Sequence, residues 1–325
     1  MINSALLCGL AFLLTVAWGK WAVSLLLRHG IGKRIRVDGP ESHQAKSGTA
    51  TMGGLYILAG MGLVMAILTL IGAPVALLPF VAMLAYGLLG AFDDLRGLKD
   101  TKGVGWLARY KFPWQWGMAI LLSLSLFWAM DSHPMIVPFS GRVLDMGIWF
   151  IPVSTLLIVA TSNAVNLTDG LDGLAGGTLS MAFLAYGVLA MLMGNQGLDH
   201  FCFALCGVLL AFLWFNVHPA RLFMGDTGSE ALGAGLAVVA MLSGYWLLLP
   251  IIGAIFAVEA LSVILQVGYF KCTRIKYGEG RRIFRMAPLH HHYELGGWPE
   301  VQVTLRFWII AAVAASAGVS LGMMR

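Results

Sequence analysis

The sequence has few charged residues, few cysteines and no long polar segment. Asp, Glu, Lys and Arg make up 11% of its 325 residues, against about 25% in soluble domains, which excludes an ordinary soluble enzyme. The four cysteines are too scattered for a disulfide framework or a zinc site. No polar stretch is long enough to build its own core. We therefore predict a single integral-membrane catalytic domain covering residues 1–325.

Long hydrophobic runs dominate the chain: 59% of its residues are hydrophobic, and the mean hydropathy is +0.81. A helix that crosses about 30 Å of hydrocarbon needs roughly 17–25 apolar residues. Runs of this kind predict an all-α polytopic membrane protein with about ten transmembrane helices. They lie near residues 4–27, 52–72, 74–92, 114–130, 148–165, 173–194, 199–217, 230–247, 248–270 and 303–323.

The basic residues predict the orientation in the membrane, because Lys and Arg concentrate in cytoplasmic loops. With the N-terminus outside, the inner loops contain all but three of the 21 basic residues. Ten spans then return the C-terminus to the outside. The net charge of +5 is thus explained by the basic residues of the inner loops. The expected partner is the lipid bilayer, and no binding of nucleic acid is expected. Residues 131–147, on the outer side, are expected to form a small hairpin around 138–141.

Four polar insertions interrupt the apolar runs and, in this topology, all open on the inner face. They are residues 91–100, 163–177, 215–229 and 286–300. Ionisable groups at membrane depth are costly and usually face a cavity, a partner or a substrate path. Because all four insertions share one face, they predict a single active site there.

The insertion at 163–177 carries polar residues at three-residue spacing: Asn163, Asn166, Asp169 and Asp172. Residues three apart are neighbours on a helix, so the set predicts a slanting polar stripe. The glycines that follow permit close approach of a ligand. The alternative is an Asp/Gly-rich turn between two helices, which would require neither the two Asn residues nor their spacing.

Asp93 and Asp94 are expected to close an apolar helix and face a loop that is rich in cations, among them Lys102 and Lys111. Carboxylates are typical ligands of a hard cation such as Mg²⁺, and Lys or Arg binds phosphate. The pair therefore suits a magnesium and phosphate site. The alternative is a solvated helix end with ordinary ion pairs.

Asp226 lies in the segment FMGDTGS, where free backbone N–H groups and hydroxyls could bind phosphate oxygens. Nearby, Asn216 and Phe223 could hydrogen-bond and stack on a base. We expect this loop to lie beside the other acidic residues.

His290, His291 and His292 are consecutive, so their side chains point in different directions and cannot converge on one ion. We interpret them as hydrogen-bond donors to phosphate oxygens; the alternative is an interfacial loop with incidental histidines. Glu259 lies inside a predicted span and needs a partner that the sequence does not reveal.

Several of these motifs together resemble a known family. Residues 46–54, Asp93–Asp94, 163–173, 215–229 and 288–294 occur in the order found in polyprenyl-phosphate N-acetylhexosamine-1-phosphate transferases. The triple histidine and the GWPE stretch at 297–300 are most similar to the branch that transfers phospho-N-acetylmuramoyl-pentapeptide. This family has ten transmembrane helices, periplasmic termini and a cytoplasmic active site, in agreement with the topology predicted above.

The resemblance implies a Mg²⁺-dependent transfer from UDP-MurNAc-pentapeptide to undecaprenyl phosphate in the bacterial inner membrane, giving lipid I and UMP. It implies a possible homodimer as well. Asp226 resembles the magnesium ligand, while Asp93, Asp94 and Asp169 resemble the other essential acids, and His290 to His292 match the catalytic histidine motif. The residues expected to contact substrate are Lys46, Asn163, Asn166, Asp172, Asn216, Phe223, Lys102 and Lys111.

Two residues depart from the family pattern. Ala50 stands where the family usually has Pro, and Glu230 stands where an apolar residue is more usual. Three other functions fit the sequence less well. A secondary transporter or lipid flippase would usually show an internal repeat, and the sequence shows none. An aromatic prenyltransferase would carry a carboxylate between Asp94 and Asp100. A GlcNAc-1-phosphate transferase of the same superfamily would have a different histidine motif.

Overall fold

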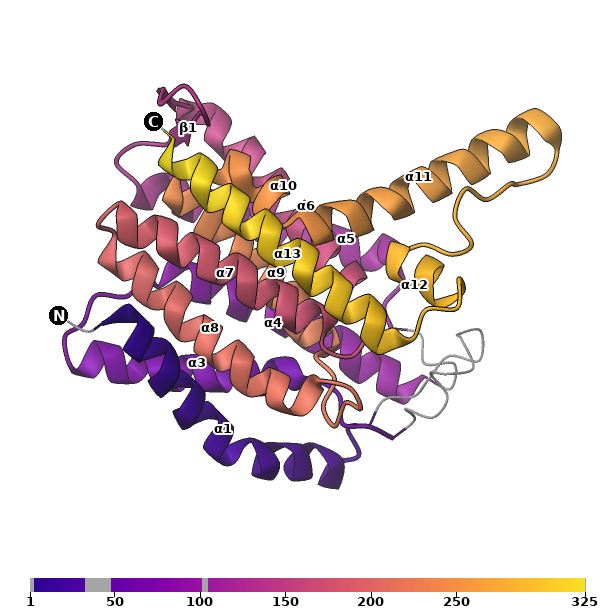
Figure 1. Ribbon diagram of the computed structural model, residues 1–325, viewed down its shortest axis with the longest axis horizontal. Helices are drawn as coiled ribbons and strands as arrows, with labels where there is room; N and C mark the ends of the chain where they lie inside the picture. Colours follow the sequence, from indigo (N-terminus) through magenta and orange to yellow (C-terminus); the bar gives the residue numbers. More distant parts are fainter. Residues whose placement is uncertain (1–2, 33–47, 101–104, 325) are drawn as a thin grey trace.

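The computed structural model describes residues 3–32, 48–100 and 105–324 and is a bundle of long helices (Figure 1). Within these ranges, ten helices have 18 residues or more, and each overlaps one predicted apolar run. They are α1 (Ser4–Arg28), α3 (Gly53–Leu70), α4 (Leu78–Lys99), α5 (Ala108–Ala129), α6 (Phe150–Thr168), α7 (Leu174–Leu192), α8 (Gln196–Asn216), α9 (Gly225–Ser243), α11 (Ala254–Tyr277) and α13 (Glu300–Met323). Short helices α10 (Leu249–Ile252) and α12 (Leu289–Glu294) and two 3-10 turns, Gly147–Trp149 and Trp246–Leu248, connect them.

Eight of the ten long helices are long and apolar enough to cross a membrane. The prediction of a polytopic helical membrane protein is thus confirmed. The other two, α5 and α9, bring polar residues into the bundle: Lys111 on α5, and Asp226 and Glu230 on α9. These same residues form the cluster described below.

Some predicted boundaries are wrong. Helix α4 continues to Lys99, so Asp93 and Asp94 lie within the helix and do not close it. Helix α9 ends at Ser243 because Gly244 adopts a left-handed conformation, with φ of 71°. A short helical connection follows, and the span predicted at 248–270 is divided between α10 and α11.

The predicted hairpin is present. Strands β1 (Pro134–Ile136) and β2 (Val143–Asp145) pair antiparallel, with Met135 opposite Leu144. The backbone N–H groups of Gly147 and His133 donate to the exposed carboxylate of Asp145 and lower its pKa.

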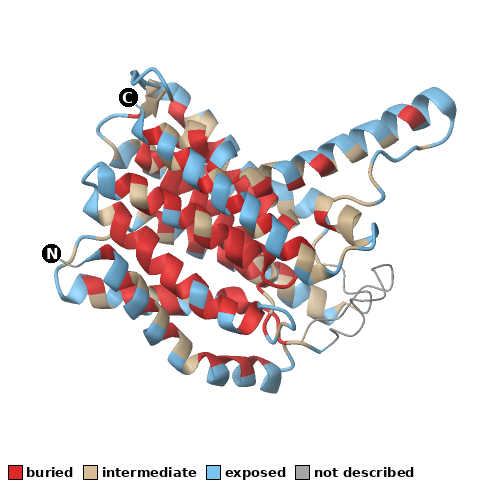
Figure 2. Cartoon of the chain, in the orientation of Figure 1, coloured by how far each residue is buried: buried red, intermediate tan, exposed pale blue. Residues whose placement is uncertain are grey.

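Helix α9 lies in the middle of the bundle and is buried along almost its whole length (Figure 2). Two glycines let neighbouring helices approach its first turn. A Cβ on Gly54 of α3 would overlap the backbone of Thr227 and Gly228, and a Cβ on Gly90 of α4 would overlap the carbonyl of Asp226. Close packing at these points fixes the beginning of α9, where Asp226 lies.

This packing can be tested with Gly90→Ala. The added methyl group has no space, so the first turn of α9 must shift, and we expect a loss of about 1–3 kcal/mol in the free energy of unfolding. Thermal unfolding of purified protein measures the change. Gly117→Ala on α5 is the matched control, because a Cβ there meets nothing within 4 Å. Equal unfolding temperatures for the two variants would contradict the assignment.

Candidate functional site

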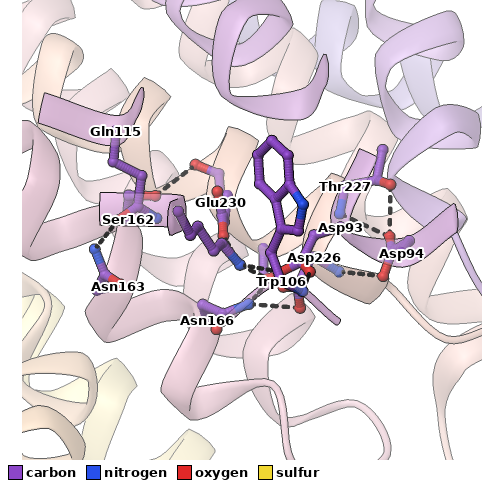
Figure 3. Close-up of polar contacts among 12 residues, drawn as sticks. Asp93, Asp94, Trp106, Gln115, Ser162, Asn163, Asn166, Asp226, Thr227 and Glu230 are labelled. Atoms are coloured by element: carbon purple, nitrogen blue, oxygen red, sulfur yellow. Dashed lines mark hydrogen bonds and ion pairs between the residues drawn. The ribbon is translucent and has the colours of Figure 1, made fainter. Parts of the chain in front are cut away.

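Three helices, α4, α5 and α9, bring charged groups together around the ammonium group of Lys111. Figure 3 shows the carboxylates of Asp93, Asp226 and Glu230 in this cluster. Nζ of Lys111 lies 2.5 Å from Oδ2 of Asp93 on α4 and 2.6 Å from Oδ2 of Asp226 on α9. It also forms an ion pair with Glu230, one helical turn further along α9. Three carboxylates thus share one cation, which balances part of their charge inside a largely apolar bundle.

Asp93 and Asp94 are adjacent in the chain but face different partners. Asp93 pairs with Lys111 and accepts a hydrogen bond from the backbone N–H of Trp106. Asp94 accepts from Asp226 N at 3.1 Å, from Thr227 N at 2.9 Å and from Thr227 Oγ1 at 2.6 Å. The first N–H groups of a helix lack intrahelical partners and favour a negative charge. Asp94 therefore caps α9 and holds Asp226 in place.

The polar face of α6 lines the same cluster. Asn166 Nδ2 donates to Asp226 Oδ1 and to Ser229 Oγ, both at 2.9 Å. Asn163 Nδ2 donates to Oε1 of the buried Gln115 at 3.1 Å. The predicted polar stripe is thus confirmed for Asn163 and Asn166, which both lie on α6.

For Asp169 and Asp172, the predicted helical stripe is wrong, because α6 ends at Thr168. Asp169 is the residue after the helix, and Asp172 lies in the turn that follows. Oδ2 of Asp172 accepts from Ala220 N at 3.1 Å and lies 3.0 Å from Nδ1 of His218. Oε2 of Glu300, at the start of α13, lies 3.6 Å from the same His218 nitrogen. Asp172 thus belongs to a second cluster, apart from Lys111.

The other expected substrate contacts are distributed around these clusters. Asn216 is buried, and its amide accepts from Gly173 N at 3.1 Å and donates to Leu222 O at 2.8 Å. The backbone of Phe223 bonds to Ala50 and Gly53. Contact of Asn216 and Phe223 with a base stays a prediction. Lys46 and Lys102 lie outside the described residues.

The three histidines have three different partners, so they do not converge on an ion. Nδ1 of His291 lies 2.8 Å from Glu294 Oε2, and Nδ1 of His292 accepts from Arg285 N at 3.1 Å. His290 is fully buried, and its imidazole packs against Gly170 in the turn after α6. Contacts therefore connect all four polar insertions of the sequence.

Glu259 has the partner that the sequence did not reveal. Its Oε2 accepts from Leu289 N at 2.5 Å, and its Oε1 accepts from His290 N at 3.1 Å. The same Oε1 lies 3.2 Å from Nδ1 of His290. Glu259, from α11, thus caps the beginning of α12 and positions the histidine motif.

Oxygen ligands suited to a metal ion are present at Lys111. Asp93, Asp226 and Glu230 each offer one carboxylate oxygen, and these oxygens lie within 4.8 Å of one another. Hard oxygen ligands of this kind suit Mg²⁺. The ammonium group of Lys111 already places one positive charge among the three carboxylates. The residues therefore fit a divalent cation. Asp172, His218 and Glu300 form another group within the same distance.

The sequence interpretation gave no site role to Glu230, Gln115 or Glu259. For Glu230 a signal exists, since it follows Asp226 by four residues, and such residues share one face of a helix. Gln115 and Glu259 reach the site through contacts between distant segments, which the local sequence does not encode.

The role of Glu259 can be tested with Glu259→Ala, which leaves two backbone N–H groups at the start of α12 without their acceptor. A lost acceptor costs roughly 1–3 kcal/mol per buried group, so we expect hydrogen exchange at Leu289 and His290 to quicken by at least about tenfold. Mass spectrometry of the peptide that contains them measures the rate. The control is Glu279→Ala, which removes an exposed carboxylate after α11 and should leave the exchange rate of this peptide unchanged. Similar exchange rates in the two variants would refute the capping role.

Comparison of the sequence with known proteins identifies the family of this chain. The sequence profile of Glycosyl transferase family 4 matches residues 76–244, which include α4 to α9. A protein named phospho-N-acetylmuramoyl-pentapeptide-transferase from Chloroflexus aurantiacus is 48% identical over 333 residues, covering 100% of this chain and 90% of the relative. Proteins of the same name from Moorella thermoacetica and Desulforapulum autotrophicum are 44% and 42% identical. The alignment with the Moorella protein covers 96% of this chain and 96% of the relative. The alignment with the Desulforapulum protein covers 95% of this chain and 90% of the relative.

The match to the Chloroflexus relative extends over the whole chain, so it includes every element that contributes to the Lys111 cluster and to the histidine motif. The transporter and prenyltransferase interpretations are thereby set aside. The chain belongs to the phospho-N-acetylmuramoyl-pentapeptide-transferases of Glycosyl transferase family 4.

Proposed function

We propose that this protein transfers phospho-MurNAc-pentapeptide from UDP-MurNAc-pentapeptide to undecaprenyl phosphate, forming lipid I and releasing UMP. The observation that carries the proposal is the convergence of Asp93, Asp226 and Glu230 on Lys111 at the beginning of α9. Carboxylates beside a cation suit a substrate that is rich in phosphate. The names of the relatives support the muramoyl substrate.

We propose that Asp226 is the main ligand of a Mg²⁺ ion, with Asp93 beside it. When bound, this ion neutralises charge on the pyrophosphate and on the departing UMP. Asp94 and Asn166 fix the position of Asp226 through hydrogen bonds to its backbone and its side chain.

The acceptor needs little activation. A phosphate monoester has its second pKa near about 6, so it is mostly a dianion at neutral pH. We propose that its oxygen attacks the sugar-linked phosphorus directly while the bond to UMP breaks, and UMP leaves with the electron pair. Asp93 or Asp94 would orient the acceptor: Asp93 contacts Lys111 and the backbone N–H of Trp106, and Asp94 contacts the first turn of α9. The positive charge of Lys111 would stabilise the transferring phosphate.

The membrane arrangement is proposed on the same basis. All ten long helices would cross the bacterial inner membrane, with both termini periplasmic and the Lys111 cluster near the cytoplasmic face. The distribution of Lys and Arg supports this orientation. A homodimer is a further expectation from the family.

Product analysis tests the reaction. Purified protein, UDP-MurNAc-pentapeptide, undecaprenyl phosphate and Mg²⁺ should give UMP and a lipid-linked product in equal amounts, and UDP-GlcNAc should give neither. Equally efficient transfer from UDP-GlcNAc would make the protein a GlcNAc-1-phosphate transferase. Release of UMP without the lipid acceptor would overturn the direct attack in favour of a covalent enzyme intermediate.

Asp226→Asn tests the metal assignment. Asparagine keeps the shape of the side chain and removes the charge, so we expect turnover to fall by about 100-fold or more while the protein stays folded. Steady-state kinetics across Mg²⁺ concentrations measures the effect. Asp145→Asn, on the exposed hairpin, is the control and should keep normal activity. Near-normal turnover of Asp226→Asn at ordinary Mg²⁺ concentrations would exclude Asp226 as the main ligand.

A further inference from the structure

Glu230 is the most deeply buried carboxylate of the Lys111 cluster. Its side chain is 1% exposed, whereas that of Asp226 is 32% exposed. It pairs with Lys111, and a further polar neighbour is the buried side chain of Gln115. A buried carboxylate that lacks a cation is strongly unfavourable, so Glu230 and Lys111 depend on each other.

Lys111 and a divalent cation compete for the same oxygens. The ammonium group lies within 2.6 Å of the carboxylates of Asp93 and Asp226, which are also offered to a metal ion. Two cations at such short distances repel each other strongly. When a metal ion binds on the exposed side, Lys111 must leave these two carboxylates, and Glu230 is the remaining partner on the buried side.

We propose that Glu230 is a positioning residue that retains Lys111 when a divalent cation binds Asp226 and Asp93. The ammonium group then keeps its ion pair with Glu230 and stays beside the substrate phosphates, and does not swing out of the site. This inference rests on the metal role proposed for Asp226.

The proposal predicts that Glu230 affects metal affinity through Lys111. Without Glu230, Lys111 is left with Asp93 and Asp226 alone and competes more strongly with the metal. If Glu230 instead bound the metal directly, its removal would weaken binding whether or not Lys111 were present.

A double-mutant cycle separates these two roles. The probe is Mn²⁺, whose free concentration is measured by electron paramagnetic resonance in solutions of purified full-length protein without substrate. Glu230→Gln should raise the Mn²⁺ dissociation constant about tenfold in the wild-type background and only about twofold in the Lys111→Met background. An equal or larger factor in the Lys111→Met background, or no change in either, would overturn the proposal.

Labelling of Lys111 gives a second test that needs only the conservative Glu230→Gln variant. An amine-reactive reagent modifies exposed lysines, and mass spectrometry reports the rate at Lys111, with the exposed Lys271 as internal reference. Adding Mn²⁺ should leave the rate at Lys111 unchanged in the wild-type protein and raise it several-fold in Glu230→Gln. The same acceleration in both proteins would contradict retention by Glu230.

Asp226→Asn distinguishes failure of this inference from failure of the metal proposal. If the wild-type protein shows no Mn²⁺ binding that depends on Asp226, the metal role itself is wrong. If that binding is present but the effect of Glu230→Gln is independent of Lys111, only the retaining role of Glu230 is wrong.

Discussion

The ion pairs of Lys111 allow three carboxylates to lie side by side within a bundle of apolar helices. Without a cation, charges of the same sign at this distance would repel one another and would each lose hydration. The surrounding structure is arranged around this constraint. Asp94 holds the first turn of α9 in place, Asn166 donates to Asp226, and Gly54 and Gly90 let α3 and α4 reach that turn.

The histidine motif depends on a similar principle at a second point. Glu259 is buried in α11, and its two oxygens accept the free N–H groups at the start of α12. His290 then packs against Gly170, in the turn that follows α6. Two carboxylates, the half-buried Asp94 and the buried Glu259, thus each cap a helix from a different segment of the chain, and in this way they join the polar insertions into one site.

The sequence predicts the long helices well, because an apolar run of membrane length determines a helix by local composition alone. The hairpin at β1 and β2 follows from equally local signals. The end of α6 at Thr168 was missed, because the three-residue spacing of Asn163 to Asp172 continues past the point where the helix stops. The separate partners of Asp93 and Asp94, and the partner of Glu259, arise from contacts between distant segments, so local patterns could not reveal them.

Helix α11 projects away from the other helices, and only its base packs against the bundle (Figure 1). The middle of the helix presents exposed apolar side chains, such as Leu261, Ile264 and Leu265. In water this would be an unstable hydrophobic surface, whereas hydrocarbon chains cover it without penalty. A helix exposed along most of its length offers more apolar surface to lipid than one that packs into the bundle throughout.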